Sequence, residues 1–279
     1  MLKANKIMRK VWVYILLGII AFICLFPYVW LLSSSFKPES KMFVIPPELI
    51  PNPFTIQNYI DAFTLSPLLR WLMNTIYITL IVVVGGSLVA SMAGFAYSKL
   101  RFPGSSVLFL IPLCAMMIPN EVIIIPLFQI WSKLHMIDQY LPLILPNIIG
   151  AGGMFGVFLF RQFYLSIPNE LMEAAKIDGC TTFGIYFKVM LPISQAPLAT
   201  LAIFNFMYTW NDFLDPLVYL NSPEKYTLSL GLSLYADMSG VLWGQLMAAC
   251  VIATLPLVIM FFAAQKRFIE SVALTGMKT

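Results

Sequence analysis

The sequence predicts an all-α membrane protein with six transmembrane helices, and three observations support this fold class. Of its 279 residues, 60% are hydrophobic and only 11% are charged, whereas soluble proteins carry about 25% charged residues. Apolar runs of about 20 residues recur, which is long enough to cross a hydrocarbon core of roughly 30 Å. Lys and Arg gather in alternate connecting segments, as expected for a chain that crosses a bilayer repeatedly.

Six apolar segments qualify as spans. They lie at about residues 11–32, 71–95, 105–127, 141–161, 196–220 and 244–265. The third and fifth are the least regular, because Pro112, Pro119, Pro126 and Pro216 interrupt them and proline removes a helical hydrogen bond.

The first span has an alternative interpretation as a secretory signal peptide, because four basic residues precede it (Lys3, Lys6, Arg9 and Lys10). Its apolar run is longer than a usual signal core, and the sequence from Phe26 to Trp30 offers no small-residue cleavage site. We therefore expect a retained span.

The distribution of Lys and Arg predicts cytoplasmic N- and C-termini. With the N-terminus inside, twelve basic residues fall in cytoplasmic segments and five outside. The inner set is Lys3, Lys6, Arg9, Lys10, Lys99, Arg101, Arg161, Lys176, Lys188, Lys266, Arg267 and Lys278; the outer set is Lys37, Lys41, Arg70, Lys133 and Lys225. The net charge of +4 thus reflects topology in a lipid bilayer, and no nucleic-acid partner is expected.

The cysteines and the single histidine suggest neither a metal site nor a disulfide framework. Cys24, Cys114 and Cys250 fall in apolar spans, Cys180 falls in a cytoplasmic segment, and no metal-ligand spacing occurs. His135 is isolated in an outer loop. We expect no bound metal and no catalytic residue.

The connecting segments fit one membrane domain. Residues 33–70 form a long, proline-broken outer loop in which 56–63 reads as a short amphipathic helix. Residues 99–104 form a short basic cytoplasmic turn, and 128–140 and 221–243 form outer segments.

Small residues mark one face of two spans. Gly86, Ala90 and Gly94 are four residues apart, as are Gly152 and Gly156, so each set lies on one helix face. Such faces allow close helix packing in lipid. They pack either inside the bundle or against a second membrane subunit, and the spacing does not decide between the two.

A polar segment after the fourth span predicts a short helix outside the membrane. Asn169 can cap it after Pro168, and Glu170 and Glu173 suit its positive end. The helix is expected to end at Gly179, which accepts a left-handed backbone. One helix face carries Leu171, Ala174, Ala175 and Asp178, and the two alanines give that face a low profile.

The same segment continues toward the fifth span. Thr181 or Thr182 can cap a second short helix, and Leu191-Pro192 is expected to end it. By itself, the segment from Glu173 to Pro192 fits a surface helix that merely connects two spans.

Its residue identities, however, follow a specific pattern. The pattern consists of Glu173-Ala174-Ala175, three residues, Gly179, nine residues, Val189, one residue and Leu191-Pro192. It resembles the EAA loop of ATP-binding-cassette (ABC) importer permeases. The family usually has Ile at the Val189 position, and Val preserves its β-branched apolar character. The charge distribution independently places this segment in the cytoplasm.

Further motifs narrow the resemblance to the carbohydrate permeases of the maltose-importer class, and to the second permease of their pair. The motifs are Ser34-Ser35-Phe36-Lys37-Pro38, residues 158–163, residues 167–171, Trp210-Asn211-Asp212-Phe213-Leu214 and Gln265-Lys266-Arg267-Phe268. The tail from Ser271 to Thr279 departs from the family's usual glycine-rich ending.

This resemblance implies a type I ABC importer permease fold in a prokaryotic plasma membrane. Residues 1–279 would form a single permease domain, with a core bundle at 70–265, the first span and outer loop at 1–69, and a coupling loop at 166–192. The residues implied in ATPase coupling are Glu170, Glu173, Ala174, Ala175, Asp178, Gly179, Leu191 and Pro192.

The implied partners are a second homologous permease, two ABC ATPase subunits, an extracellular solute-binding protein and a sugar substrate. The chain has no phosphate-binding Gly-x-x-x-x-Gly-Lys-Ser/Thr loop. We therefore expect no cofactor on this chain, with ATP and Mg²⁺ bound by the ATPase subunits, and no enzymatic activity of its own.

Polar residues within spans are costly and tend to face a cavity or a partner. A rise of about 1.5 Å per residue places Glu121, Asn147 and Asp212 at a similar depth. The predicted translocation path comprises Asn120, Glu121, Asn147, Asn205, Trp210, Asn211 and Asp212. The alternative is that Glu121 and Asp212 lie at headgroup level and contact water.

Two rival functions remain at the level of sequence. Within the superfamily, the solute could instead be a glycerophosphodiester or a peptide. From another class, the chain could be a self-contained secondary transporter or channel, although the polar loop and the lack of a deep charged relay argue against it. The sequence does not name the sugar or the partner subunits.

Overall fold

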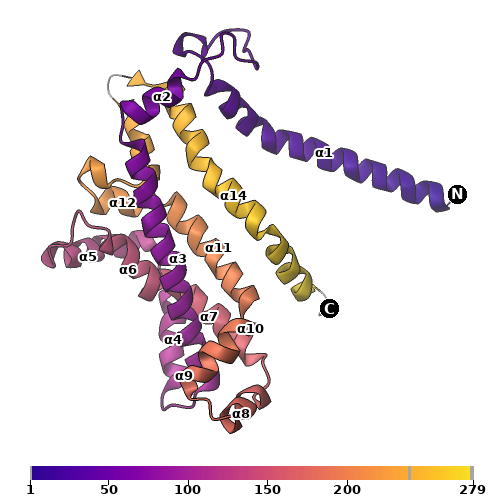
Figure 1. Ribbon diagram of the computed structural model, residues 1–279, viewed down its shortest axis with the longest axis vertical. Helices are drawn as coiled ribbons and strands as arrows, with labels where there is room; N and C mark the ends of the chain where they lie inside the picture. Colours follow the sequence, from indigo (N-terminus) through magenta and orange to yellow (C-terminus); the bar gives the residue numbers. More distant parts are fainter. Residues whose placement is uncertain (1, 238–239, 277–279) are drawn as a thin grey trace. The chain divides into compact units, whose positions relative to one another are not determined.

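The computed structural model describes residues 2–237 and 240–276, most of which are helical (Figure 1). The α-helices are α1 (Leu2–Ser34), α2 (Gln57–Thr64), α3 (Leu68–Lys99), α4 (Ser105–Ala115), α5 (Asn120–Lys133), α6 (Leu141–Ile149), α7 (Ala151–Leu165), α8 (Glu170–Ile177), α9 (Thr182–Ile185), α10 (Leu191–Ile193), α11 (Gln195–Asn211), α12 (Leu214–Tyr219), α13 (Leu228–Leu232) and α14 (Trp243–Gly276). The described residues also form three short 3₁₀ helices and one π-helix. The 3₁₀ helices are η1 (Glu39–Lys41), η3 (Pro223–Lys225) and η4 (Ser233–Tyr235), and the π-helix is η2 (Tyr186–Met190). Strands β1 (Ala236–Asp237) and β2 (Gly240–Val241) pair antiparallel.

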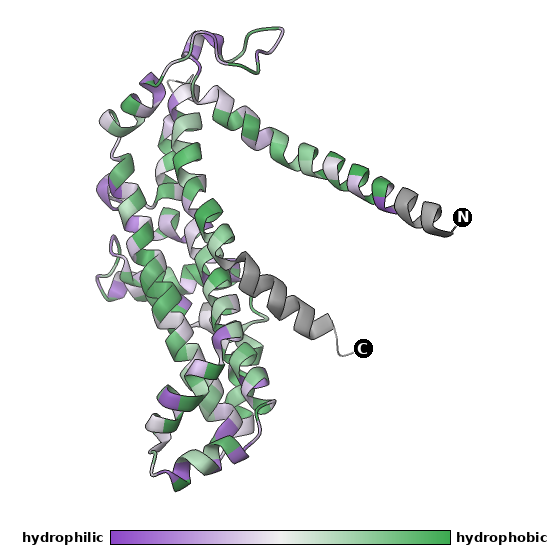
Figure 2. Ribbon diagram, turned by 45° about the vertical axis from the view of Figure 1, so that its right-hand side comes forward, coloured by the Kyte–Doolittle hydropathy of each residue, from purple (hydrophilic) through white to green (hydrophobic). Residues whose placement is uncertain are grey.

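The chain forms two compact units. Unit 1 comprises Met1–Leu68 with Leu232–Leu255, and unit 2 comprises Leu69–Gly231 with Pro256–Thr279. Within unit 2, α8 and α9 lie at one end of α3, whereas α12 lies toward the other end (Figure 1). Hydrophobic residues predominate along the helices between these ends (Figure 2).

Four helical segments are long and apolar enough to cross a membrane. They are Lys10–Ser34, Leu68–Lys99, Leu141–Leu165 and Trp243–Ala263. Two further pairs qualify only if each pair counts as one span: α4 with α5, bent by 101°, and Thr182–Ile193 with Gln195–Asn211, bent by 78°. Within residues 2–237 and 240–276 the total is therefore four candidate spans, or up to six.

The two irregular spans differ from the sequence prediction. The third, expected to run from 105 to 127, breaks after Ala115, and α5 resumes only after Pro119, whose extended backbone (φ −60°, ψ 141°) ends the turn between them. The fifth, expected at 196–220, ends at Asn211 because Asp212 is extended (ψ 123°). Pro216 lies in the first turn of α12, where proline is tolerated, and causes no break.

The helix predicted at 56–63 is confirmed as α2 (Gln57–Thr64). Buried Asn58 holds it to the preceding loop, because its Nδ2 donates to the Ser35 and Lys37 carbonyls at 2.9 and 2.7 Å. The Phe36 ring stacks on Phe54 with centroids 4.9 Å apart. The outer loop of unit 1 is thus folded on itself rather than extended.

Two groups of buried side chains form the core of unit 2. The α8-end cluster comprises Ala90, Phe95, Phe109, Val157, Phe160, Tyr164, Met172, Ala175, Ile185, Tyr186, Met190 and Leu201. The α12-end cluster comprises Ile78, Val82, Trp131, Leu143, Ile144, Tyr219, Leu220 and Leu230. Helix α3 contributes to both, so it runs the length of the unit.

The small-residue faces pack inside the unit. A Cβ added at Gly94 would lie 2.5 Å from Phe160 Cβ and 2.8 Å from the Arg161 nitrogen. A Cβ at Gly156 would lie 2.7 Å from Ala90 Cβ. Helices α3 and α7 therefore approach closely at these glycines, which resolves the two alternatives for these positions in favour of internal packing.

Candidate functional site

The predicted coupling segment begins with α8, and its start differs in one detail from the expectation. Asn169 occupies the N-cap position but makes no capping hydrogen bond with its side chain. Instead, Asn169 Oδ1 accepts a hydrogen bond from Lys99 Nζ at 2.8 Å, and the Ile167 carbonyl accepts another at 2.6 Å. Helix α8 is thereby held to the C-terminal end of α3.

The two faces of α8 have different surroundings. Met172 and Ala175 are buried in the α8-end cluster. Glu170, Glu173, Ala174 and Asp178 are exposed, as are Leu171 and Ile177, of which Ile177 is 87% exposed. The expectation that Ala174 and Ala175 share one exposed surface is therefore wrong for Ala175, whose side chain instead anchors the helix to the core.

The end of α8 follows the prediction. Gly179 has φ +79°, the left-handed conformation that favours glycine. Thr181 then caps α9 by accepting a hydrogen bond from the Gly184 nitrogen at 3.2 Å. The expectation that Leu191-Pro192 ends this second helix is wrong: both residues lie in α10 (Leu191–Ile193), which directly follows η2, and the break before α11 comes at Ser194. All eight predicted coupling residues thus lie on one continuous segment between α7 and α11.

A cavity of about 550 Å³ lies within unit 2. Its lining comprises Val82, Ala115, Met116, Ile118, Asn120, Ile123, Leu127, Trp131, Leu145, Pro146, Asn147, Ile149, Gly150, Phe155, Phe204, Asn205, Tyr208, Thr209 and Asp215. Of the predicted path residues, Asn120, Asn147 and Asn205 line it. Among the described residues, none of those that line it is Lys, Arg or His.

The other predicted path residues are not part of this lining. Glu121 is exposed, and Trp210 is buried with its ring stacked on Phe206. Asn211 Nδ2 donates to the Met207 carbonyl of its own helix at 2.7 Å. Asp212 Oδ1 accepts from the Asp215 nitrogen at 3.3 Å and so holds the turn into α12. Of these four predicted residues only Asp212 lies beyond α11; Trp210 and Asn211 are in its last turn, and Glu121 is in the first turn of α5.

Four cavity residues carry polar groups that the sequence prediction missed: Trp131, Tyr208, Thr209 and Asp215. Asp215 accepts a hydrogen bond from Asn120 Nδ2 at 3.1 Å. Trp131 Nε1 and Thr209 Oγ1 are buried and have no hydrogen-bond partner among residues 2–237 and 240–276. Its spacing could have indicated Asp215, because it follows Asp212 by three residues and so lies about one helical turn away.

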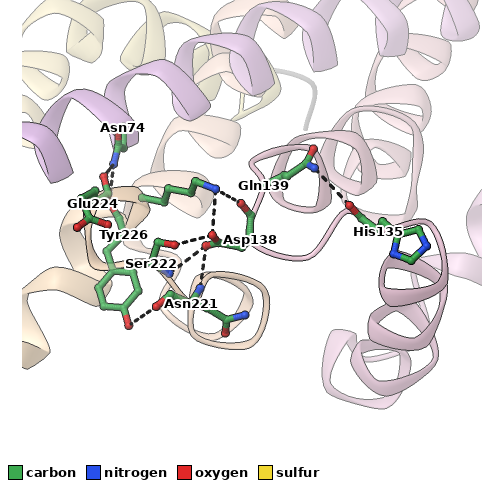
Figure 3. Close-up of polar contacts among 9 residues, drawn as sticks. Asn74, His135, Asp138, Gln139, Asn221, Ser222, Glu224 and Tyr226 are labelled. Carbon is green, nitrogen blue, oxygen red and sulfur yellow. Dashed lines mark hydrogen bonds and ion pairs between the residues drawn. The ribbon is translucent and has the colours of Figure 1, made fainter.

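A polar cluster ties two connecting segments together at the α12 end of unit 2 (Figure 3). The Asp138 carboxylate accepts from the Asn221 and Ser222 nitrogens at 3.0 Å each and from Ser222 Oγ at 2.6 Å. Lys225 Nζ lies 2.9 Å from Asp138 Oδ2. Burial opposes ionisation of Asp138, but these hydrogen bonds outweigh it and hold its pKa below the ordinary value.

The next residues of the same connection are anchored on α3. Asn74 Nδ2 donates to the Glu224 and Tyr226 carbonyls at 2.9 and 3.0 Å, and Trp71 Nε1 donates to the Pro223 carbonyl at 2.7 Å. The segment 221–226 is therefore held both to the start of α3 and to the α5–α6 connection.

The residues that the structure describes contain no cluster of side chains suited to bind a metal ion. No group of three or more His, Cys, Asp and Glu residues there could hold a metal ion, and the four cysteines are free thiols.

Comparisons with known proteins place these features in a family. Residues 83–273 match the family described as binding-protein-dependent transport system inner membrane component. The arabinooligosaccharides transport system permease protein AraQ of Halalkalibacterium halodurans is 39% identical over 93% of this chain and 93% of its own length. The sn-glycerol-3-phosphate transport system permease protein UgpE of Yersinia enterocolitica is 30% identical over 95% of this chain and 96% of its own.

The fold also matches a solved structure. One chain of a bacterial ABC transporter involved in the import of the acidic polysaccharide alginate superposes with a TM-score of 0.84 at 23% identity, covering 94% of this chain and 97% of that chain. The resemblance to ABC importer permeases is thus confirmed, and the chain belongs to the family of inner-membrane permease components of binding-protein-dependent transport systems.

Proposed function

We propose that this chain is the membrane-spanning permease subunit of an ATP-driven importer of sugars or oligosaccharides. It would pair with a second, homologous permease, receive its substrate from an extracellular solute-binding protein, and be driven by two ATPase subunits that bind ATP and Mg²⁺. It would reside in a prokaryotic plasma membrane with both termini in the cytoplasm.

The observation that carries the proposal is the two-faced structure of α8. Its buried residues, Met172 and Ala175, fix the helix to the core. Its exposed residues combine the acidic Glu173 and Asp178 with the apolar Leu171 and Ile177. Exposed apolar side chains beside charged ones are typical of a protein contact surface, so α8 is suited to bind an ATPase subunit.

The length of α3 supports an assignment of α8 and the 221–226 segment to opposite sides of the membrane. Lys99 contacts Asn169 just before α8, whereas Asn74 contacts the backbone of Glu224. These α3 positions are separated by about 37 Å of helix at about 1.5 Å per residue. This exceeds a hydrocarbon core of roughly 30 Å.

The cavity favours a neutral, hydroxyl-rich substrate. Three amides and the Tyr208 hydroxyl line the cavity and offer donors and acceptors for sugar hydroxyl groups, and the buried Trp131 Nε1 and Thr209 Oγ1 have no partner within the described residues. An anionic substrate is usually bound by Arg or Lys, and the described lining residues include neither. This chemistry agrees better with the arabinooligosaccharides named for one relative than with the glycerol phosphate named for the other.

Purification of the tagged full-length chain from its native membranes, followed by reconstitution, tests the proposal. We expect a phosphate-loop ATPase and a second permease to co-purify in stoichiometric amounts, and arabinotriose with the solute-binding protein to stimulate ATP hydrolysis. A chain that purifies alone and transports on an ion gradient would instead be a secondary transporter.

Two substitutions test the coupling role of α8. Glu173→Lys reverses the charge at one exposed position of α8, and Gly179→Asp forces a non-glycine residue into φ +79°, which costs about 1–2 kcal/mol. We expect both to abolish sugar-stimulated ATP hydrolysis. The matched controls are Glu224→Lys, an exposed carboxylate in η3, and Gly184→Ala, where an added Cβ meets only ordinary contacts at 3.4 Å and beyond.

A further inference from the structure

Four buried hydroxyl groups form a continuous hydrogen-bond chain in the α8-end cluster. Tyr186 Oη donates to Ser91 Oγ at 3.1 Å, Ser91 and Tyr164 hydroxyls lie 2.8 Å apart, and Tyr164 Oη donates to Ser194 Oγ at 3.2 Å. Ser194 Oγ then donates to the Leu191 carbonyl at 2.8 Å. With Ser91 donating to Tyr164, each of the four protons has one acceptor.

This hydroxyl chain begins and ends in the coupling segment and passes through two spanning helices. Tyr186 belongs to the π-helix η2, and Leu191 and Ser194 lie in α10 and at its end. Ser91 lies in the C-terminal third of α3, and Tyr164 lies near the end of α7. The exposed fraction of all four hydroxyl-bearing side chains is 2% or less.

The hydroxyl chain differs from the apolar contacts around it in being directional. The contacts of Met172 and Ala175 with the cluster are hydrophobic, which is a non-directional attraction that tolerates small displacements. Hydrogen bonds, in contrast, are directional and weaken steeply with misalignment; those of the hydroxyl chain measure 2.8 to 3.2 Å. A displaced partner here would leave a buried hydroxyl unsatisfied, because no water replaces it in a packed core.

From this geometry we infer that Tyr164, Tyr186, Ser91 and Ser194 are positioning residues that make the segment 186–194 move as one body with α3 and α7. A displacement of α8 by a bound ATPase subunit is then passed to the spanning helices rather than absorbed within the loop. This inference rests on the proposed coupling function of α8.

The test uses the whole complex reconstituted in liposomes and measures arabinotriose imported per ATP hydrolysed. Tyr164→Phe keeps the ring contacts with Phe95 and Phe160 and removes both central hydrogen bonds. We expect the import ratio to fall by about 2- to 30-fold, the range by which single residues modulate coupling between sites. A change in folding stability alone would lower the amount of complex and leave this ratio unchanged.

Tyr97→Phe is the matched control. Tyr97 also lies on α3 and packs against the same cluster, but the structure gives its hydroxyl no hydrogen bond within the described ranges. Its import ratio should equal that of the wild type. If Tyr164→Phe fails to assemble, Tyr186→Phe carries the test, because it removes only the first donor of the chain.

Parallel measurement of Glu173→Lys separates the two claims. An unchanged import ratio in Tyr164→Phe and Tyr186→Phe, with loss of sugar-stimulated hydrolysis in Glu173→Lys, would overturn the positioning role and leave the proposed function intact. Absence of sugar-stimulated hydrolysis in the wild-type complex would overturn the proposed function, and this inference with it.

Discussion

Lys225 Nζ lies 2.9 Å from Asp138 Oδ2 and also donates to the Asp138 backbone oxygen at 2.6 Å. The contact joins the α5–α6 connection to the segment that follows α12. Asp138 has a left-handed backbone (φ 61°), which is uncommon for a non-glycine residue. The hydrogen bonds to its carboxylate stabilise that conformation and fix the relation of the two connections.

Asp138→Asn should lower the stability of unit 2. Asn tolerates a left-handed backbone and keeps one acceptor, so the change removes mainly the charge-assisted hydrogen bonds. We expect a loss of about 1–2 kcal/mol, measured as a lower thermal unfolding midpoint in detergent. Glu48→Gln is the control, because Glu48 pairs with Lys41 at 3.5 Å on the surface and such pairs contribute little. An equal decrease in the unfolding midpoint of the two variants would show that the Asp138 contacts stabilise the protein no more than a surface ion pair does.

The same carboxylate gives the stability a defined pH dependence. Because the folded-state pKa of Asp138 lies below its ordinary value, the stabilisation is fully present above the unfolded-state pKa of about 3.9. It is lost as pH falls below that value toward the folded pKa. The difference in unfolding midpoint between wild type and Asp138→Asn should therefore be constant from about pH 5 to 8 and shrink below about pH 4. A difference that grows on acidification would be inconsistent with these contacts.

Gly94→Ala should separate α3 from α7. The added Cβ would lie 2.5 Å from Phe160 Cβ and 2.8 Å from the Arg161 backbone nitrogen, so a helix must shift. Overpacking of this kind costs about 1–3 kcal/mol. Gly18→Ala in α1 is the control, since its Cβ would meet no atom within 4 Å. Thermal unfolding of both variants measures the effect, and no destabilisation by Gly94→Ala would argue against the close helix contact.

Trp131→Phe tests the cavity as part of the sugar path. The substitution keeps an aromatic ring in the lining and removes the free Nε1 donor. We expect weaker arabinotriose uptake in the reconstituted complex, by about 5- to 10-fold for one lost hydrogen bond. Asn211→Ala is the control, because Asn211 bonds its own helix and does not line the cavity. If only Asn211→Ala impaired uptake, the path would follow the originally predicted residues instead.

The coupling segment was predictable from sequence because its structure is local. Gly179 and Thr181 act through neighbouring backbone atoms, so their roles follow from residue type and spacing. The burial of Ala175 was not predictable, because which face of α8 is buried depends on the helices that it packs against in the folded protein.

The predicted path residues and the residues that line the cavity coincide only in part, for a similar reason. A rise per residue gives depth only along a straight helix, and the chain bends at Pro119 and at Asp212. Trp131 and Asp215 follow those bends in the chain, and both line the cavity. The hydroxyl chain of Tyr186, Ser91, Tyr164 and Ser194 joins residues up to about a hundred positions apart, and no local pattern indicates it.

We propose that the exposed face of α8 binds an ATPase subunit. The most direct test is chemical labelling of Ala174→Cys in a chain whose four native cysteines are replaced. A maleimide should modify this cysteine rapidly in the permease pair alone and slowly, by about tenfold or more, in the complete complex, since a buried interface excludes the reagent. Equal labelling rates with and without the ATPase subunits would contradict the claim.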